Sequence, residues 1–263
     1  MRYTLIAAIA IGCAAAVHAQ KTAPKPPTET DWAAIAKLPD FTGVWEVGLG
    51  GPPPGRGTGV PAPPPARGGR GRAGGIPAGP QLTPAYAEKR RANLAKGAED
   101  NQTANCLPPG MPGIMGQPYP MEFLLTPGMV TIVIEAYSQV RHIYTDGRPL
   151  PDDPDPKFFG TSIGRWDNGT LVVDTVGFSP QTDIAPNTPH SDRMSIVERF
   201  RLTDPDTMSI ETTITDPDAL AAPYTTMRTL RRHRAWTIAE YICEENNRNF
   251  VDQNGKAGIN INK

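Results

Sequence analysis

The chain has 263 residues, and its 26 Lys and Arg residues against 27 Asp and Glu residues give a formal net charge of −1. A charge balance this close to zero leaves no electrostatic footprint for nucleic acid, so we expect no nucleic-acid partner. The length allows one substantial hydrophobic core or two small domains. No stretch after residue 19 is long and apolar enough to form a transmembrane segment.

Residues 1–19 have the pattern of a signal peptide. Arg2 supplies the positive charge, and the apolar run 5–16 is too short to cross a bilayer as a helix. Small residues at the two positions that decide cleavage predict a cut after Ala19 and export to the periplasm or the medium. A lipid-modified Cys13 is the alternative, but Ala10 stands where such a site usually has leucine.

Removal of the signal peptide leaves Cys106 and Cys243. In an oxidising compartment two cysteines more often pair than not, and a disulfide here would tie an N-terminal segment to the last predicted strand. Two separate buried thiols are the alternative. No spacing of Cys or His is typical of a zinc, haem or redox site, so we expect neither a metal nor a cofactor.

The N-terminal third alternates between short structured segments and proline-rich ones. Residues 20–40 form an extension, and residues 41–48 contain a first strand. Residues 49–82 are dominated by Gly, Pro, Ala and Arg and cannot bury enough apolar surface to offset the cost of ordering, which predicts disorder. In the segment 83–120, Thr83-Pro84 predicts the start of a short helix that continues to about Lys96 and precedes a proline-rich loop.

From residue 121 onward the pattern is almost wholly that of β-strands separated by turn signals. The clearest is Asn168-Gly169, because both central residues of a type I′ hairpin turn need a positive φ. The predicted strands cover residues 121–126, 129–137, 139–145, 161–166, 170–178, 194–202, 207–215, 225–233 and 236–243.

Together with the strand in 41–48, these segments give about ten strands that are mostly joined by tight turns. A run of antiparallel hairpins is an up-and-down meander, and closing it removes exposed edges. We therefore predict a mainly β chain whose body, residues 121–249, is a single antiparallel up-and-down β-barrel, followed by a flexible tail over 250–263. A two-sheet β-sandwich is the alternative.

Two resemblances accompany this pattern. Phe41-Thr-Gly-Val-Trp45 resembles the Gly-x-Trp entry of lipocalin and fatty-acid-binding barrels, which implies a tryptophan that closes one barrel end beneath a cationic side chain. The span 82–249 resembles a large family of secreted bacterial proteins, and this resemblance implies no particular reaction. It is carried by the segments CLPPGMPGIM at 106–115, YTDGRP at 144–149, GRWDNGTLVVDTVGF at 164–178 and YICEENN at 241–247.

Strand alternation places polar groups on faces that otherwise read as apolar. These groups are His142, Asp146, Asp174, Glu198 and Glu240. Because a carboxylate among apolar side chains is costly unless it is paired, they indicate either a functional cluster inside the barrel or inward ion pairs with Arg231 or Arg228 opposite.

Pro189-His190-Ser191-Asp192 is a second candidate, on a loop before a predicted strand. His190 would titrate near neutrality and could act as a base at the barrel mouth. A turn in which Ser191 or Asp192 bonds the following backbone is the structural alternative.

These features favour an exported β-barrel that binds a small apolar or aromatic molecule in its lumen. The predicted ligand-binding residues are Tyr144, Asp146, Asp174, Asp192 and Arg231. The alternative is a cofactor-independent enzyme, an isomerase, lyase or hydratase, and its predicted catalytic residues are His142, His190, Glu198 and Glu240. A second alternative is a structural or interaction protein of the cell envelope. The sequence does not indicate which oligomeric state the protein has.

Overall fold

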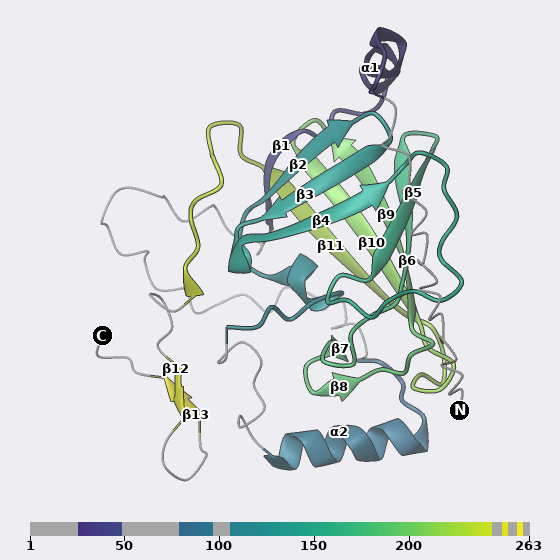
Figure 1. Cartoon of the computed structure of the whole chain (residues 1–263). Coiled ribbons are helices and arrows are strands. Elements are labelled where there is room, and N and C mark those ends of the chain that lie inside the picture. The colour runs from purple at the N-terminus through teal and green to yellow at the C-terminus, as the bar shows by residue number, and fades with distance from the viewer. Residues whose placement is uncertain (1–25, 49–78, 97–105, 244–248, 252–256, 260–263) are drawn as a thin grey trace, which may run out of the picture.

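Nine strands close into one β-barrel (Figure 1) in a computed structural model that describes residues 26–48, 79–96, 106–243, 249–251 and 257–259. Around the barrel the strands follow the order β1, β11, β10, β9, β6, β5, β4, β3 and β2. Their bounds are β1 Gly43–Val47, β2 Met121–Thr126, β3 Met129–Ile134, β4 Gln139–Tyr144, β5 Thr161–Asp167, β6 Thr170–Val176, β9 Ser195–Asp204, β10 Thr207–Thr215 and β11 Tyr224–Arg232. The predicted mainly β fold with a single barrel is confirmed.

Short helices and small hairpins flank the barrel. Figure 1 places α1 at one end, and it places α2 and the β7–β8 hairpin at the opposite end. The bounds are α1 Glu29–Ile35, α2 Pro84–Lys96, the 3-10 helices η2 Gly113–Gly116 and η3 Ala136–Ser138, and the strands β7 Asp183–Ala185, β8 Thr188–Pro189, β12 Asn249–Val251 and β13 Ala257–Ile259. The helix predicted to start at Thr83-Pro84 is therefore confirmed as α2.

The strongest turn signal of the sequence is also confirmed. Asn168 and Gly169 join β5 to β6, with φ values of 47° and 77°. Both residues lie in the left-handed region, which a two-residue hairpin loop of this kind requires.

One pair of neighbouring strands departs from the antiparallel meander. β4 and β5 are parallel, with Ile143 opposite Ser162. Parallel neighbours need a long crossover connection, and the connection here is the proline-rich segment 145–160. Proline lacks a backbone donor, so this segment contributes poorly to a sheet ladder.

The predicted strand at 236–243 is wrong. β1 pairs with β11 on one side and with β2 on the other, so the closed barrel offers no free edge to another strand. The segment instead runs outside the ladder, where the Tyr241 ring packs edge-on against Tyr119 with 5.4 Å between ring centroids. It ends at the predicted Cys106–Cys243 disulfide, which is confirmed.

The barrel end nearer to α1 is closed by side chains. Trp45 is fully buried, and its Nε1 donates to the Phe41 carbonyl oxygen at 2.9 Å. The guanidinium carbon of Arg232 lies 4.5 Å from the Trp45 ring centroid, and Arg232 Nη1 is 2.8 Å from Asp40 Oδ2. A tryptophan beneath a cation is the arrangement that the Gly-x-Trp segment implied.

The predicted signal peptide lies outside the described residues, as does nearly all of the predicted disordered segment 49–82. Most of the predicted tail over 250–263 is likewise outside them. In the part of the chain that the structure describes, no helix is both long and apolar enough to span a bilayer.

Candidate functional site

Of the predicted acidic residues, Glu198 alone lies in the sealed interior of the barrel. It is fully buried, and its carboxylate accepts a hydrogen bond from Nη2 of Arg141, which is 1% exposed. The same nitrogen lies 3.3 Å from Ser162 Oγ and 3.2 Å from Thr175 Oγ1, and these two hydroxyls are 2.9 Å apart. Glu198 thus belongs to a polar cluster that links β4, β5, β6 and β9.

This cluster is an inward ion pair, and its cation is Arg141 rather than Arg228 or Arg231. Neither Arg141 nor Glu198 lines the cavity at the α2 end that is described below. A charge buried this deeply must be paired, and Arg141 and Glu198 pair with each other. Their hydrogen bonding is incomplete, because Arg141 Nε and Nη1 and Glu198 Oε1 are buried without a hydrogen-bond partner in the described part of the chain. The sequence held a signal for the missed partner, because Arg141 alternates with Ile143 on the face of β4 that the prediction did not choose.

The face predicted to be inward on β4 is the outward one. His142 is exposed, with its Nδ1 3.4 Å from Thr131 Oγ1. Tyr144 lies under the guanidinium of Arg148 at 3.8 Å, and Arg148 Nη2 is 2.5 Å from Asp146 Oδ2. Hydrogen bonding from Arg148 holds the pKa of Asp146 below its usual range. Alternation defines two faces of a strand but does not show which one is buried. On β4 the buried face is the one that carries Arg141, the partner of Glu198.

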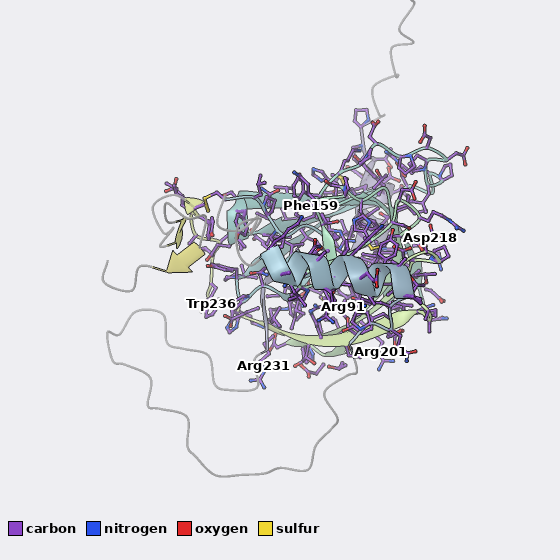
Figure 2. The ribbon with its side chains drawn as sticks, turned by 90° about the horizontal axis from the view of Figure 1, so that it is seen from below. Arg91, Phe159, Arg201, Asp218, Arg231 and Trp236 are labelled. Atoms are coloured by element: carbon purple, nitrogen blue, oxygen red, sulfur yellow. A yellow bond between two sulfur atoms is a disulfide. The ribbon has the colours of Figure 1, made fainter. Side chains whose placement is uncertain are left out.

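Three more predicted residues lie outside the lumen. Asp174 faces outward on β6 and pairs with Arg165, whose Nη1 is 2.5 Å from Asp174 Oδ2. Arg231 is exposed on β11 and lies at the outer edge of the barrel in Figure 2. Glu240 is exposed in the segment after β11. The predicted lumen cluster of a histidine and several carboxylates is therefore not assembled.

His190 is half-buried directly after β8, whereas Asp192 is exposed. The Nε2 atom of His190 lies 3.0 Å from Thr182 Oγ1 and its Nδ1 lies 2.6 Å from the Ser191 carbonyl oxygen. Both ring nitrogens are engaged within the protein. The turn alternative is confirmed, because the Arg193 backbone N–H donates to Ser191 Oγ at 3.1 Å.

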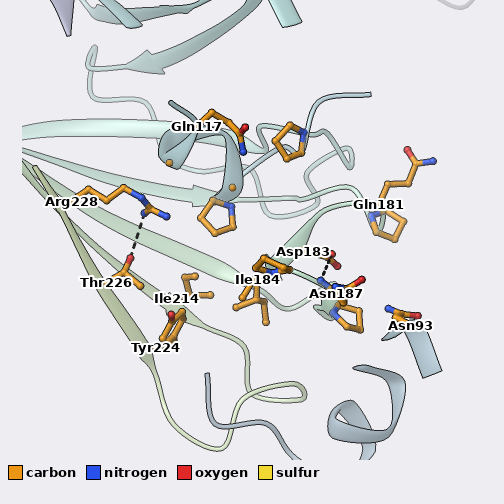
Figure 3. Close-up of a pocket in the computed structure, with 18 of the residues that line it drawn as sticks. Asn93, Gln117, Gln181, Asp183, Ile184, Asn187, Ile214, Tyr224, Thr226 and Arg228 are labelled. Atoms are coloured by element: carbon orange, nitrogen blue, oxygen red, sulfur yellow. Dashed lines mark hydrogen bonds between the residues drawn. The ribbon is translucent and has the colours of Figure 1, made fainter. Parts of the chain in front are cut away.

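The main cavity lies at the α2 end of the barrel and has a volume of about 810 Å³ (Figure 3). Its walls are the inner faces of β10 and β11, the helix η2 with the loop before it, and the β7–β8 hairpin, with α2 across this end (Figure 2). Along β11, Tyr224, Thr226 and Arg228 alternate with exposed residues and point inward. The cavity is therefore the hollow end of the lumen.

The lining combines apolar and polar groups in similar measure. Ile184, Ile214 and Tyr224 line it together with prolines from the loop before η2 and from the β7–β8 region. Arg228 Nη1 is 3.5 Å from Thr226 Oγ1. Across the cavity, the Asn187 backbone N–H donates to Asp183 Oδ2 at 3.1 Å, and burial raises the pKa of Asp183.

Sequence reasoning missed most of this site because its walls come from segments far apart in the chain. The available signal was the period-two pattern of Tyr224, Thr226 and Arg228, which marks one face of a strand. No comparable signal marks the β7–β8 hairpin or η2 as walls of the same cavity.

A metal centre is not formed in the described ranges, where no three His, Cys, Asp or Glu side chains lie close enough to hold an ion. In comparisons with known proteins, no family model matches the chain and no curated protein matches it. The barrel and its cavity are therefore the features of this protein that bear on its function.

Proposed function

We propose that this protein is an exported barrel that binds a small, largely apolar or aromatic molecule in the cavity at its α2 end. The observation that carries the proposal is the cavity itself, whose volume of about 810 Å³ falls within the range of about 300–1,000 Å³ typical of small-molecule sites. Its apolar side chains offer a contact surface, and its polar groups offer the orienting contacts that such sites use.

Two observations support export. The Cys106–Cys243 disulfide is of a kind that persists in oxidising compartments. Residues 1–19 carry the signal-peptide pattern described above.

Binding is better supported than catalysis. Of the four predicted catalytic residues, His142 and Glu240 are exposed, Glu198 is sealed in an ion pair, and His190 has both ring nitrogens engaged. No observation in the described structure favours the enzyme alternative. The envelope-tether alternative depends on the Pro/Gly/Arg segment, which lies outside the described residues.

A fluorescence titration with N-phenyl-1-naphthylamine, an uncharged aromatic probe, tests the proposal. Thr226 and Thr225 are neighbours on β11, but Thr226 lines the cavity whereas Thr225 is exposed outside the barrel. They therefore offer a matched pair of substitutions. We expect saturable binding at one site in the wild type and in Thr225→Trp. Binding should be weaker in Thr226→Trp, where the indole occupies part of the cavity.

Ala185→Trp adds the same bulk from the β7–β8 wall and replaces Thr226→Trp if that variant does not fold. Melting temperatures establish that each variant used is folded. Absence of saturable binding by the wild type would overturn the proposal. So would equal binding by Thr225→Trp and by the variant that carries tryptophan in the cavity wall.

A further inference from the structure

We propose that the ligand of this cavity is a small amphipathic carboxylate, with its acid group bound by Arg228 and its apolar body lying toward Tyr224 and Ile214. The inference rests on the proposed function, since it assigns a chemical class to the ligand of the same cavity. Its starting observation is the charge of one inward side chain.

Three arginines face the inside of the barrel, and two of them have acidic partners. Arg141 pairs with Glu198, and Arg232 pairs with Asp40. Among the described residues, no carboxylate forms an ion pair with Arg228. A guanidinium that lines a cavity without a counter-ion is a suitable partner for an anionic group of a ligand.

The guanidinium of Arg228 is held in place yet left open. Its Nη1 has one long contact, at 3.5 Å, to Thr226 Oγ1. Its other side packs against η2 so closely that a Cβ on Gly116 would lie 2.8 Å from Arg228 Nε and 2.9 Å from Nη2. None of its nitrogens is both buried and without a hydrogen-bond partner, so the unbonded donors remain accessible at the cavity wall.

A guanidinium carries five N–H donors in a planar fork that matches the two oxygens of a carboxylate. The long contact to Thr226 leaves most of these donors for a ligand. A carboxylate therefore satisfies Arg228 in charge and in geometry, whereas an uncharged ligand satisfies it only in part.

The positions of the apolar side chains in the cavity indicate the length of the ligand's apolar body. Tyr224 lies four residues before Arg228 on the same inward face, about 13 Å away along the strand. Ile214 is directly opposite Tyr224 in the β10–β11 register. A molecule that reaches from the guanidinium to these side chains has an apolar body on the order of 10 Å long.

Arg228 and Asp183 have opposite preferences for an acid group, and Lys96 of α2 also lines the cavity. Figure 3 shows Arg228 on one side and Asp183 with Asn187 on the other. The carboxyl of Asp183 would repel an anion placed beside it, because like charges at close range are unfavourable. The orientation of the ligand follows from these two residues.

The test compares 2-naphthoate with 2-naphthamide, which share ring and size but differ in charge, as competitors of N-phenyl-1-naphthylamine. We expect the wild type to bind 2-naphthoate about 10- to 100-fold more tightly than 2-naphthamide, the range that a charge-assisted hydrogen bond supports. Arg228→Gln should abolish this preference, because it removes the charge that distinguishes the two competitors. Arg231→Gln, on the same strand but facing outward, should keep the preference.

The outcomes separate the two proposals. Equal affinity for both competitors in the wild type, or a preference that survives Arg228→Gln, would overturn the carboxylate inference while leaving a small-molecule site. Failure of every aromatic probe to bind would overturn the proposed function itself. If Arg228→Gln does not fold, Arg228→Lys keeps the charge without the fork, and it should reduce the preference for 2-naphthoate over 2-naphthamide.

Discussion

The buried Arg141–Glu198 pair gives the sharpest prediction about stability. Replacing Glu198 with Gln keeps the shape of the side chain and removes its charge. Arg141 would then remain fully buried, with two hydroxyls and an amide but no anion. Removing one partner of such a pair costs about 3–5 kcal/mol, and we expect the lower end, about 3 kcal/mol, because the amide oxygen can still accept from Arg141.

The assay is urea unfolding of the disulfide-bonded protein, followed by circular dichroism. With a denaturant slope of about 3 kcal/mol/M, the midpoint should fall by about 1 M while the slope itself stays constant. The matched control is Glu211→Gln, because Glu211 is half-exposed and lies 3.9 Å from Arg199 Nε on the outer face. Loss of that surface pair should cost no more than about 1 kcal/mol.

The double variant Arg141→Met, Glu198→Leu sharpens the reasoning. Replacing a buried pair with apolar side chains of similar size is often neutral or stabilising, so this variant should be more stable than Glu198→Gln alone. A cost below about 1 kcal/mol for Glu198→Gln would refute the argument, because it would mean that the buried arginine does not need its anion.

Three further outcomes follow from other buried groups. Thr212→Val should be neutral or stabilising by up to about 1 kcal/mol in urea unfolding, because the buried Thr212 hydroxyl has no hydrogen-bond partner among the described residues. A cost above about 1 kcal/mol would contradict this. Thiol labelling of the denatured, unreduced mature protein should find no free thiol at Cys106 or Cys243. The double variant Cys106→Ser, Cys243→Ser should lose about 2–5 kcal/mol of stability. Burial acts to raise the pKa of Asp216, but hydrogen bonds led by the backbone N–H and hydroxyl of Ser191 outweigh it and lower the pKa. A lowered folded-state pKa adds stability above the unfolded value of about 3.9, so Asp216→Asn should destabilise the protein at pH 7 and lose its effect as the pH falls below about 4. An equal effect at pH 7 and pH 3 would contradict this assignment.

Local signals in the sequence were sufficient for most of the barrel. The turn at Asn168-Gly169 and the helix start at Thr83-Pro84 depend on residues adjacent in the chain, and both were correct. The segment 236–243 has strand-like alternation, but the barrel was already closed by β1, which is a property of the whole sheet. The parallel β4–β5 pair is likewise set by tertiary closure rather than by local pattern.

The site was predicted less well for a physical reason that His142 and Arg141 illustrate. Apolar neighbours made the His142 side of β4 read as the core face, yet β4 buries Arg141 because Glu198 on β9 neutralises it. A charge becomes buried when its partner comes from another strand, and neighbouring residues in the sequence cannot show that partner. The same limit applies to the cavity. Arg228 differs from the other inward arginines in its lack of an acidic partner among the described residues, and this difference is visible only in the structure.

The three inward arginines also show how the lumen is divided. At the α1 end, Arg232 covers Trp45 and is neutralised by Asp40, which closes the barrel. In the middle, Arg141 and Glu198 share the sealed interior with apolar side chains. At the α2 end, Arg228 faces a hollow whose walls outside the closed ladder come from η2, the β7–β8 hairpin and α2. Barrel closure does not fix these walls, so changes in them can alter which apolar body fits while the strand that holds Arg228 stays the same. We therefore expect selectivity for the body of the ligand to reside in these three segments.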